Sequence, residues 1–173
     1  MTPALVILAA GVGSRYGGPK QIEPVGPAGA TLLDYSIYDA RRAGFGTVVV
    51  VIRPELATAF DRIDATVAIQ RLDDIPAGLT MPAARTKPWG TGHAVLAAAT
   101  AVRSPFAVVN ADDFYGRDAF ARAADQLLRD YEEIPLPIRE KGLAASRRVL
   151  DTYALDKQRR ELVEFFSGLV AER

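Results

Sequence analysis

The chain of 173 residues is long enough for one domain with a single substantial core and short for two. Its 21 lysines and arginines balance 21 aspartates and glutamates, so no overall field attracts it to nucleic acid or to an anionic membrane, and binding of any anion must depend on local charges. The absence of cysteine excludes disulfides, thiolate metal sites and cysteine nucleophiles, and it fits a cytoplasmic protein.

The first apolar run, at 4–10, has the character of a signal-peptide centre. No basic segment precedes it, and Arg15 and Lys20 follow soon after, so the sequence predicts no export. No run in the sequence approaches the roughly 20 apolar residues that a membrane helix requires. We therefore expect a cytoplasmic protein that makes no use of a membrane.

Short β-branched runs alternate with helical patterns over the first 130 residues, as in a parallel sheet with crossover helices. The predicted strands are 4–8, 47–52, 66–70 and 106–110, and the predicted helices are 31–43, 91–102 and one that begins near Gly116. In the run TVVVVI at Thr47–Ile52 the residues after Thr47 are all apolar, which suits a strand covered on both faces. The expected fold is α/β, a Rossmann-like, mostly parallel sheet with helices on both faces, truncated and followed by a helical tail.

The last part of the chain, 131–173, differs in character from the first 130 residues, so we expect a domain boundary at residue 130. Two prolines interrupt the pattern at 131–137, and two amphipathic helices are predicted at 139–153 and 156–172. The second helix carries one apolar stripe, made of Leu162, Phe165, Phe166 and Leu169. This stripe either covers the core or a sheet edge, or it binds a partner, which includes a second copy of the chain.

The most informative segment, LAAGVGSRYGGPKQ at 8–21, directly follows the first predicted strand. Its four glycines allow a sharp turn and bring backbone amides close to an anion. Arg15 and Lys20 add two positive charges to the same loop, as a triphosphate would require. The combination indicates a phosphate site, although a glycine pattern alone also fits an ordinary turn between a strand and a loop.

Two familiar phosphate loops match this segment less well. A Walker A loop ends in Gly-Lys-Ser/Thr, whereas Lys20 lies between Pro19 and Gln21. A dinucleotide fingerprint places a glycine where Tyr16 stands and an acid where Arg53 follows the second strand. Because an arginine there suits the extra phosphate of NADP, an NADP-binding domain stays open as a distant alternative.

The segment resembles the signature loop of the sugar-phosphate nucleotidyltransferases, which include glucose-1-phosphate thymidylyltransferases and N-acetylglucosamine-1-phosphate uridylyltransferases. Two later segments are similar to motifs of the same family. WGTGHAV at 89–95 looks like the turn that lies against the nucleoside, and VNADDFYG at 109–116 looks like the turn whose aspartate binds magnesium. The resemblance implies nucleotide binding by Leu8, Ala10, Gly11, Gly13, Ser14, Arg15, Lys20, Gly90, Thr91 and Asp112.

Three of these residues carry the chemistry that the resemblance implies. Arg15 holds the outer phosphates, Lys20 contacts the phosphate under attack, and Asp112 binds Mg²⁺, with Asp113 beside it. An acceptor such as a sugar 1-phosphate attacks the α-phosphate, and pyrophosphate leaves. On the residues alone, the paired aspartates also fit a simple helix cap. The single histidine, His93, is expected to be structural.

The resemblance covers roughly 3–130. Complete family members continue with further strands, most of the acceptor pocket and a second metal ligand, and 131–173 resembles none of these. Pro88 also stands where the family often has a base-reading glutamine, so the base preference stays open. We therefore expect either an intact transferase or a nucleotide-binding remnant, and we expect this chain to bind nucleotide and Mg²⁺ but to turn over poorly.

Overall fold

The computed structural model of the chain describes residues 2–11, 20–76 and 78–133. It divides into two compact units, one of Met1–Asp74 with Met81–Tyr131 and the other of Ile75–Thr80 with Glu132–Arg173. In the smaller unit the Leu79 amide donates to the Pro76 carbonyl at 3.2 Å, which closes a turn. The sheet belongs to the larger unit.

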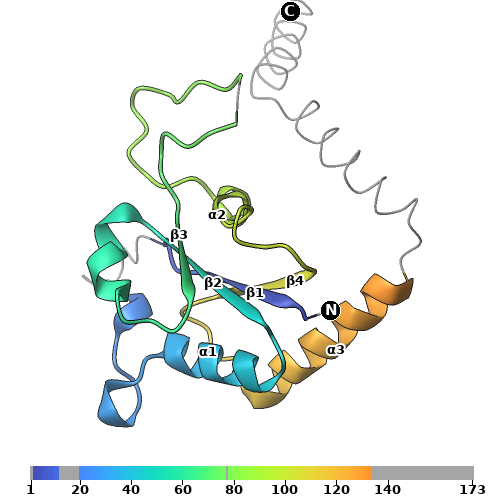
Figure 1. Ribbon diagram of the computed structural model, residues 1–173. Coiled ribbons are helices and arrows are strands. Elements are labelled where there is room, and N and C mark those ends of the chain that lie inside the picture. Colours follow the sequence, from blue (N-terminus) through green and yellow to red (C-terminus); the bar gives the residue numbers. More distant parts are fainter. Residues whose placement is uncertain (1, 12–19, 77, 134–173) are drawn as a thin grey trace, which may run out of the picture. The chain divides into compact units, whose positions relative to one another are not determined.

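The larger unit contains a parallel sheet with strand order β3-β2-β1-β4 (Figure 1). The strands are β1 (Ala4–Leu8), β2 (Thr47–Ile52), β3 (Thr66–Ile69) and β4 (Phe106–Asn110). All four predicted strands are confirmed, and β3 ends one residue earlier than expected. The backbone amide of Gln70 still donates to the Ile52 carbonyl at 2.8 Å, whereas the side chain of Gln70 donates to the Trp89 carbonyl.

Helix α1 (Leu32–Arg42) is one residue shorter at each end than the predicted 31–43, and both of its ends are capped. The Thr31 hydroxyl accepts from the Asp34 amide at 3.1 Å, and the Asp34 carboxylate accepts from the Thr31 amide at 2.8 Å, which is a capping box. At the other end Gly44 adopts a φ of 90°. The amides of Gly44 and Phe45 donate back to Arg41 and Ala40, as in a Schellman motif.

Helices cover both faces of the sheet, as expected from the apolar run of β2. On one face α1 and α3 (Arg117–Glu133) lie together, and on the other lies α2 (Thr91–Ala97) (Figure 1). The first face packs the larger core, which includes Leu5, Val50, Phe45 and Phe120. The second face packs a smaller core, in which Ala94 of α2 contacts the cluster around Val6 and Val49.

Helix α2 is shorter than the sequence predicts, and the prediction of a helix over 91–102 is wrong in its second half. After Ala97 the amides of Ala98, Ala99 and Ala101 donate three residues back, at 3.0–3.1 Å, so the chain tightens into turns. An alanine-rich segment has a strong helical propensity at every position, and it therefore gives no signal for where the packing stops.

Three short 3₁₀ helices went unpredicted: η1 (Lys20–Ile22), η2 (Pro27–Gly29) and η3 (Pro54–Phe60). The last of them buries Leu56 and Phe60 in the larger core. Helix α3 runs to Glu133, across the boundary expected at residue 130. The helices and the apolar stripe predicted after that boundary lie outside the described residues. None of the helices in the described part of the chain is long and apolar enough to span a bilayer.

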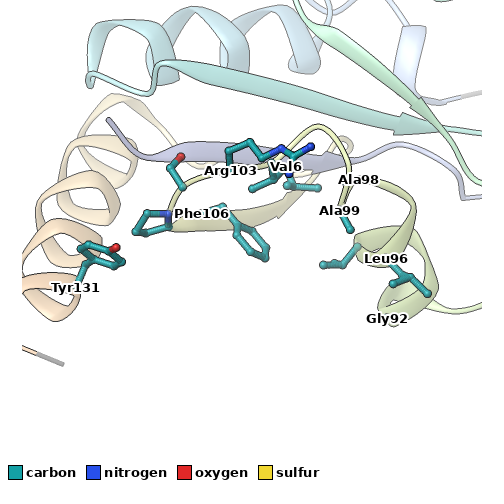
Figure 2. Close-up of a pocket in the computed structure, with 12 residues that line it drawn as sticks. Val6, Gly92, Leu96, Ala98, Ala99, Arg103, Phe106 and Tyr131 are labelled. Carbon is teal, nitrogen blue, oxygen red and sulfur yellow. The ribbon is translucent and has the colours of Figure 1, made fainter. Parts of the chain in front are cut away.

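Strand β4 pairs with β1 on one side, and no described strand pairs with its other side. Its residues alternate between partly buried and exposed, and Phe106 and Val108 are 39% and 41% exposed. Beside Phe106 lies an apolar groove of about 530 Å³, lined on the α2 side by Leu96 and Ala99 and on the α3 side by Tyr131 (Figure 2).

Candidate functional site

The carboxyl ends of β1 and β4 lie side by side, which brings two of the candidate segments together. Leu8, the last residue of β1, is in register with Asn110, the last residue of β4. The Ala111 amide then donates to the Leu8 carbonyl at 3.1 Å and keeps the two chains adjacent past the strands. Open parallel sheets bind ligands at this edge. The glycine-rich segment and the turn with Asp112 therefore both begin at one ligand-binding edge.

Gln21 joins the two ends of the glycine-rich segment. Its side chain is 7% exposed, and its Nε2 donates to the Gly11 carbonyl at 3.1 Å. Its Oε1 is buried and has no partner among the described residues. This bond holds the start and the return of the segment together at the end of β1, beside Leu8 and the buried Ala10. Of the predicted phosphate ligands, Gly13, Ser14, Arg15 and the side chain of Lys20 lie outside the described residues.

A second candidate turn, Trp89–Gly90–Thr91, is fixed by Gln70 at the carboxyl end of β3. The Gln70 side chain is 4% exposed, and its Nε2 donates to the Trp89 carbonyl at 3.1 Å and approaches the Gly90 carbonyl at 3.4 Å. The same nitrogen lies 3.1 Å from Nδ1 of His93. Gly90 and Thr91 are exposed at the start of α2, where their backbone is open to a ligand.

The hydrogen bonds of His93 fix its tautomer. Because the Gln70 amide donates, Nδ1 of His93 must accept, and the proton then sits on Nε2, which donates to the Asp74 carbonyl. The ring also contacts Trp89, whose indole nitrogen donates to the Leu72 carbonyl at 2.9 Å. These contacts support the interpretation of His93 as a structural residue, one that ties the irregular segment after β3 to the first turn of α2.

We expect Gln70→Ala to destabilise the protein. The change leaves the partly buried carbonyl of Trp89 without its donor and removes the donor to Nδ1 of His93, which costs about 1–3 kcal/mol when such groups stay unpaired. Urea denaturation followed by circular dichroism measures the loss. The matched control is Gln126→Ala on the exposed face of α3, which should change the free energy of unfolding by less than about 0.5 kcal/mol. Equal losses in both variants would contradict the role of Gln70.

The two aspartates of the turn after β4 differ in their surroundings. Asp113 Oδ2 accepts from Asn110 Nδ2 at 2.9 Å and from the Tyr115 hydroxyl at 3.2 Å. Asp112 is exposed and has no hydrogen bond or ion pair with any other described residue. Neither carboxylate caps α3 within the described part of the chain, so the helix-cap interpretation of the pair gains no support. Asp112 is the carboxylate that remains available to a ligand.

Tyr115 stays protonated at neutral pH. Partial burial, and after it the negative charge of Asp113, raises the pKa of the phenol above its ordinary value. A protonated hydroxyl both accepts from the Asn110 amide, at 2.9 Å, and donates to Asp113. The contacts of this turn therefore persist through the neutral pH range.

Arg53, the candidate for an NADP phosphate, follows β2 at the same edge of the sheet. It lines a small cavity of about 220 Å³ together with Gln70 and Trp89. Its Nη1 lies 3.9 Å from a Glu55 oxygen, so a carboxylate already neighbours the guanidinium.

Three residues of the site were not predicted from the sequence, namely Gln21, Gln70 and Tyr115. Each side chain acts through a hydrogen bond to a residue that lies between 5 and 20 positions away. For Gln70 a signal existed, since a polar side chain directly after an apolar strand marks the ligand-binding edge. For Gln21 and Tyr115 no pattern in the sequence indicates the residue with which the side chain forms its hydrogen bond.

Comparison with known proteins identifies the fold and the domain type. The MobA-like NTP transferase domain family matches residues 5–167. The "Bifunctional enzyme IspD/IspF" of Ruegeria sp. (strain TM1040) is 42% identical over 65 residues, which is 36% of this chain and 16% of that protein.

Solved structures share the fold at low sequence identity. Rv0371c from Mycobacterium tuberculosis H37Rv matches with a TM-score of 0.53 and 20% identity, over 72% of this chain and 60% of that one. A nucleotidyl transferase from Methanothermobacter thermautotroptrophicus matches with a TM-score of 0.51 and 17% identity, over 72% of this chain and 57% of that one. A UDP-glucose pyrophosphorylase complexed with UDP-glucose matches with a TM-score of 0.51 and 20% identity, over 76% of this chain and 55% of that one. The chain thus spans little more than half the length of these structures.

Proposed function

This chain belongs to the MobA-like NTP transferase domain family, and from that premise we propose that it provides the nucleoside triphosphate and Mg²⁺ site for the transfer of a nucleoside monophosphate to a sugar 1-phosphate, a transfer that the chain itself completes slowly. The observation that carries the proposal is the register of Leu8 with Asn110, because it starts the glycine-rich segment and the Asp112 turn at adjacent strand ends. Phosphate-binding amides and a free carboxylate at one edge are what a metal-bound triphosphate needs.

In the proposed reaction an oxygen of the acceptor phosphate attacks the α-phosphorus, the bond from that phosphorus to the bridging oxygen breaks, and pyrophosphate leaves. Arg15 and Lys20 neutralise the phosphates, and the exposed backbone at Gly90 and Thr91 lies against the nucleoside. Such a displacement depends on alignment and on charge stabilisation more than on an acid or a base. The Gln21 and Gln70 bonds support this assignment, because they hold the backbone at Gly11 and at Trp89.

The donor set fits Mg²⁺. In nucleotide sites this ion is commonly held by one or two carboxylates together with phosphate oxygens and water, and Asp112 offers one unpaired carboxylate. When bound, Mg²⁺ would neutralise charge on the phosphates. We assign the metal to Asp112 and the nucleotide-binding core to residues 1–130. We also propose that the protein is located in the cytoplasm and that it self-associates through the last predicted helix.

A pyrophosphate-release assay with four nucleoside triphosphates and several sugar 1-phosphates tests the proposal. Release that requires both substrates and reaches about one turnover per second supports an intact transferase. Magnesium-dependent nucleotide binding without release favours the second candidate, a nucleotide-binding domain that does not complete the transfer. Stabilisation by NADPH alone, with no effect of any triphosphate, would reject both.

We expect Arg15→Ala and Lys20→Ala to weaken triphosphate binding about 10- to 150-fold each. A charge-assisted contact contributes roughly 1.5–3 kcal/mol, which corresponds to that range. Isothermal titration calorimetry with the preferred nucleotide measures the change, and unfolding curves check that the variants fold. Arg62→Ala, an exposed arginine after η3, is the matched control and should bind as the unaltered protein does. Unchanged affinity in both loop variants would remove the phosphate assignment.

A further inference from the structure

The turn that follows β4 is closed by a ring of three hydrogen bonds. The backbone amide of Asn110 donates to the Tyr115 hydroxyl at 2.9 Å, and that hydroxyl donates to Asp113 Oδ2 at 3.2 Å. The Asn110 side chain then donates to the same carboxylate oxygen at 2.9 Å. We name this group of Asn110, Asp113 and Tyr115 the β4 clamp. It joins the last residue of the strand to both a later carboxylate and a later phenol.

The β4 clamp is anchored to the protein core at both ends. The Tyr115 ring packs edge-on against Phe120 with 6.0 Å between the ring centres, and Phe120 is 3% exposed. At the start of the turn Ala111 is buried, and its amide donates to the Leu8 carbonyl. Asp112 lies between these two anchors. A short turn fixed at both ends leaves its middle residue few backbone conformations.

The β4 clamp also separates the roles of the two neighbouring carboxylates. Asp113 Oδ2 accepts two hydrogen bonds and is held within the turn, whereas Asp112 has no hydrogen bond or ion pair with another described residue. Residues that orient a metal ligand typically change metal affinity 10- to 100-fold when they are removed.

We propose that Asn110, Asp113 and Tyr115 are positioning residues that hold Asp112 ready for a divalent cation, and that Asp113 itself does not ligate the metal. The inference rests on the proposed function, because it assigns the cation to Asp112. It adds that the acceptor capacity of Asp113, and not its charge, is what the site requires. An amide in its place keeps that capacity, and a methyl group does not.

Magnesium titrations of nucleotide binding by the full chain test this inference. The titrations use the nucleoside triphosphate that binds best of the four. They measure the Mg²⁺ concentration at which its binding is half-maximal. We expect Tyr115→Phe and Asp113→Ala to raise it about tenfold. Asp113→Asn, which keeps both accepted bonds, should raise it less than about threefold. Nucleotide affinity without Mg²⁺ should stay the same in all three variants, which general damage to the fold would not allow.

Tyr38→Phe is the matched control, because it removes a phenol hydroxyl from the exposed face of α1, outside the β4 clamp. An Asp113→Asn effect as large as that of Asp112→Asn would overturn the inference by making Asp113 a ligand. An unaltered Mg²⁺ requirement in Tyr115→Phe would overturn the positioning role.

A second measurement separates this inference from the proposed function. Hydrogen exchange of the Asn110 amide, followed by NMR, should become at least about tenfold faster in Tyr115→Phe, since that amide loses its acceptor. If the unaltered chain shows no magnesium-dependent nucleotide binding, the proposed function fails, and the exchange rate still decides whether the clamp exists. Unchanged exchange would reject the clamp even if nucleotide binds.

Discussion

Asp112→Asn should reduce magnesium-dependent nucleotide binding by about 100-fold or more, since removal of a direct ligand should exceed the effect of removing a residue that orients one. The substitution keeps the size of the side chain and removes its charge, and Mg²⁺ prefers charged oxygen ligands. Because Asp112 is exposed and has no hydrogen bond or ion pair with other described residues, the stability of the fold should change little. Calorimetric titrations with and without Mg²⁺ measure the effect.

The control for this prediction is the neighbouring substitution Asp113→Asn, which is equally conservative. Equal losses of binding in the two variants would show that the metal assignment is misplaced. A loss of binding that also appears without Mg²⁺ would place Asp112 on the nucleotide and not on the cation.

Phe45→Ala should lower the free energy of unfolding by about 3–5 kcal/mol, which is a large fraction of the stability of a typical domain. Phe45 is 2% exposed, belongs to the larger core and takes part in the turn that ends α1. The truncation removes apolar contacts and leaves a cavity that the surrounding strands and helices fill only in part.

Phe114→Ala provides the matched control, because its ring is 72% exposed. Chemical denaturation of both variants should show a change below about 0.5 kcal/mol for Phe114→Ala. A small loss in Phe45→Ala would mean that the α1 face of the sheet is packed less tightly than the burial of this side chain indicates.

The elements that the sequence predicts well are marked by residues within them or directly beside them. Strand β2 is an apolar run between polar neighbours, and α1 has Thr31 before it and Gly44 after it. The end of α2 depends instead on how far the smaller core reaches, and alanine gives no periodicity from which to infer that. The same reason explains why η3 was missed, since its two buried side chains are defined by packing alone.

The candidate site also has some features that the sequence predicts and others that it does not. The positions of Gly11 and Asp112 at the edge of the sheet follow from strands that the sequence reveals, whereas the place of Gly90 depends on its contact with Gln70. The distinct surroundings of Asp112 and Asp113 do not, because Tyr115 and Asn110 decide them through contacts across the turn. Two adjacent aspartates are equivalent in the sequence, and only their hydrogen-bond donors distinguish them.

The central place of β1 has a consequence for the order of folding during synthesis. β1 pairs with β2 on one side and with β4 on the other, and Ala4 meets Phe106 about a hundred residues later in the chain. At roughly 5–20 residues per second, a ribosome needs on the order of 5–20 s to supply that second partner. The β1-α1-β2 portion can associate during this interval, whereas the Asp112 turn acquires its neighbour only when β4 arrives. The edge that carries the candidate site is thus assembled late, and a nascent chain that stalls before residue 110 lacks the Asp112 turn.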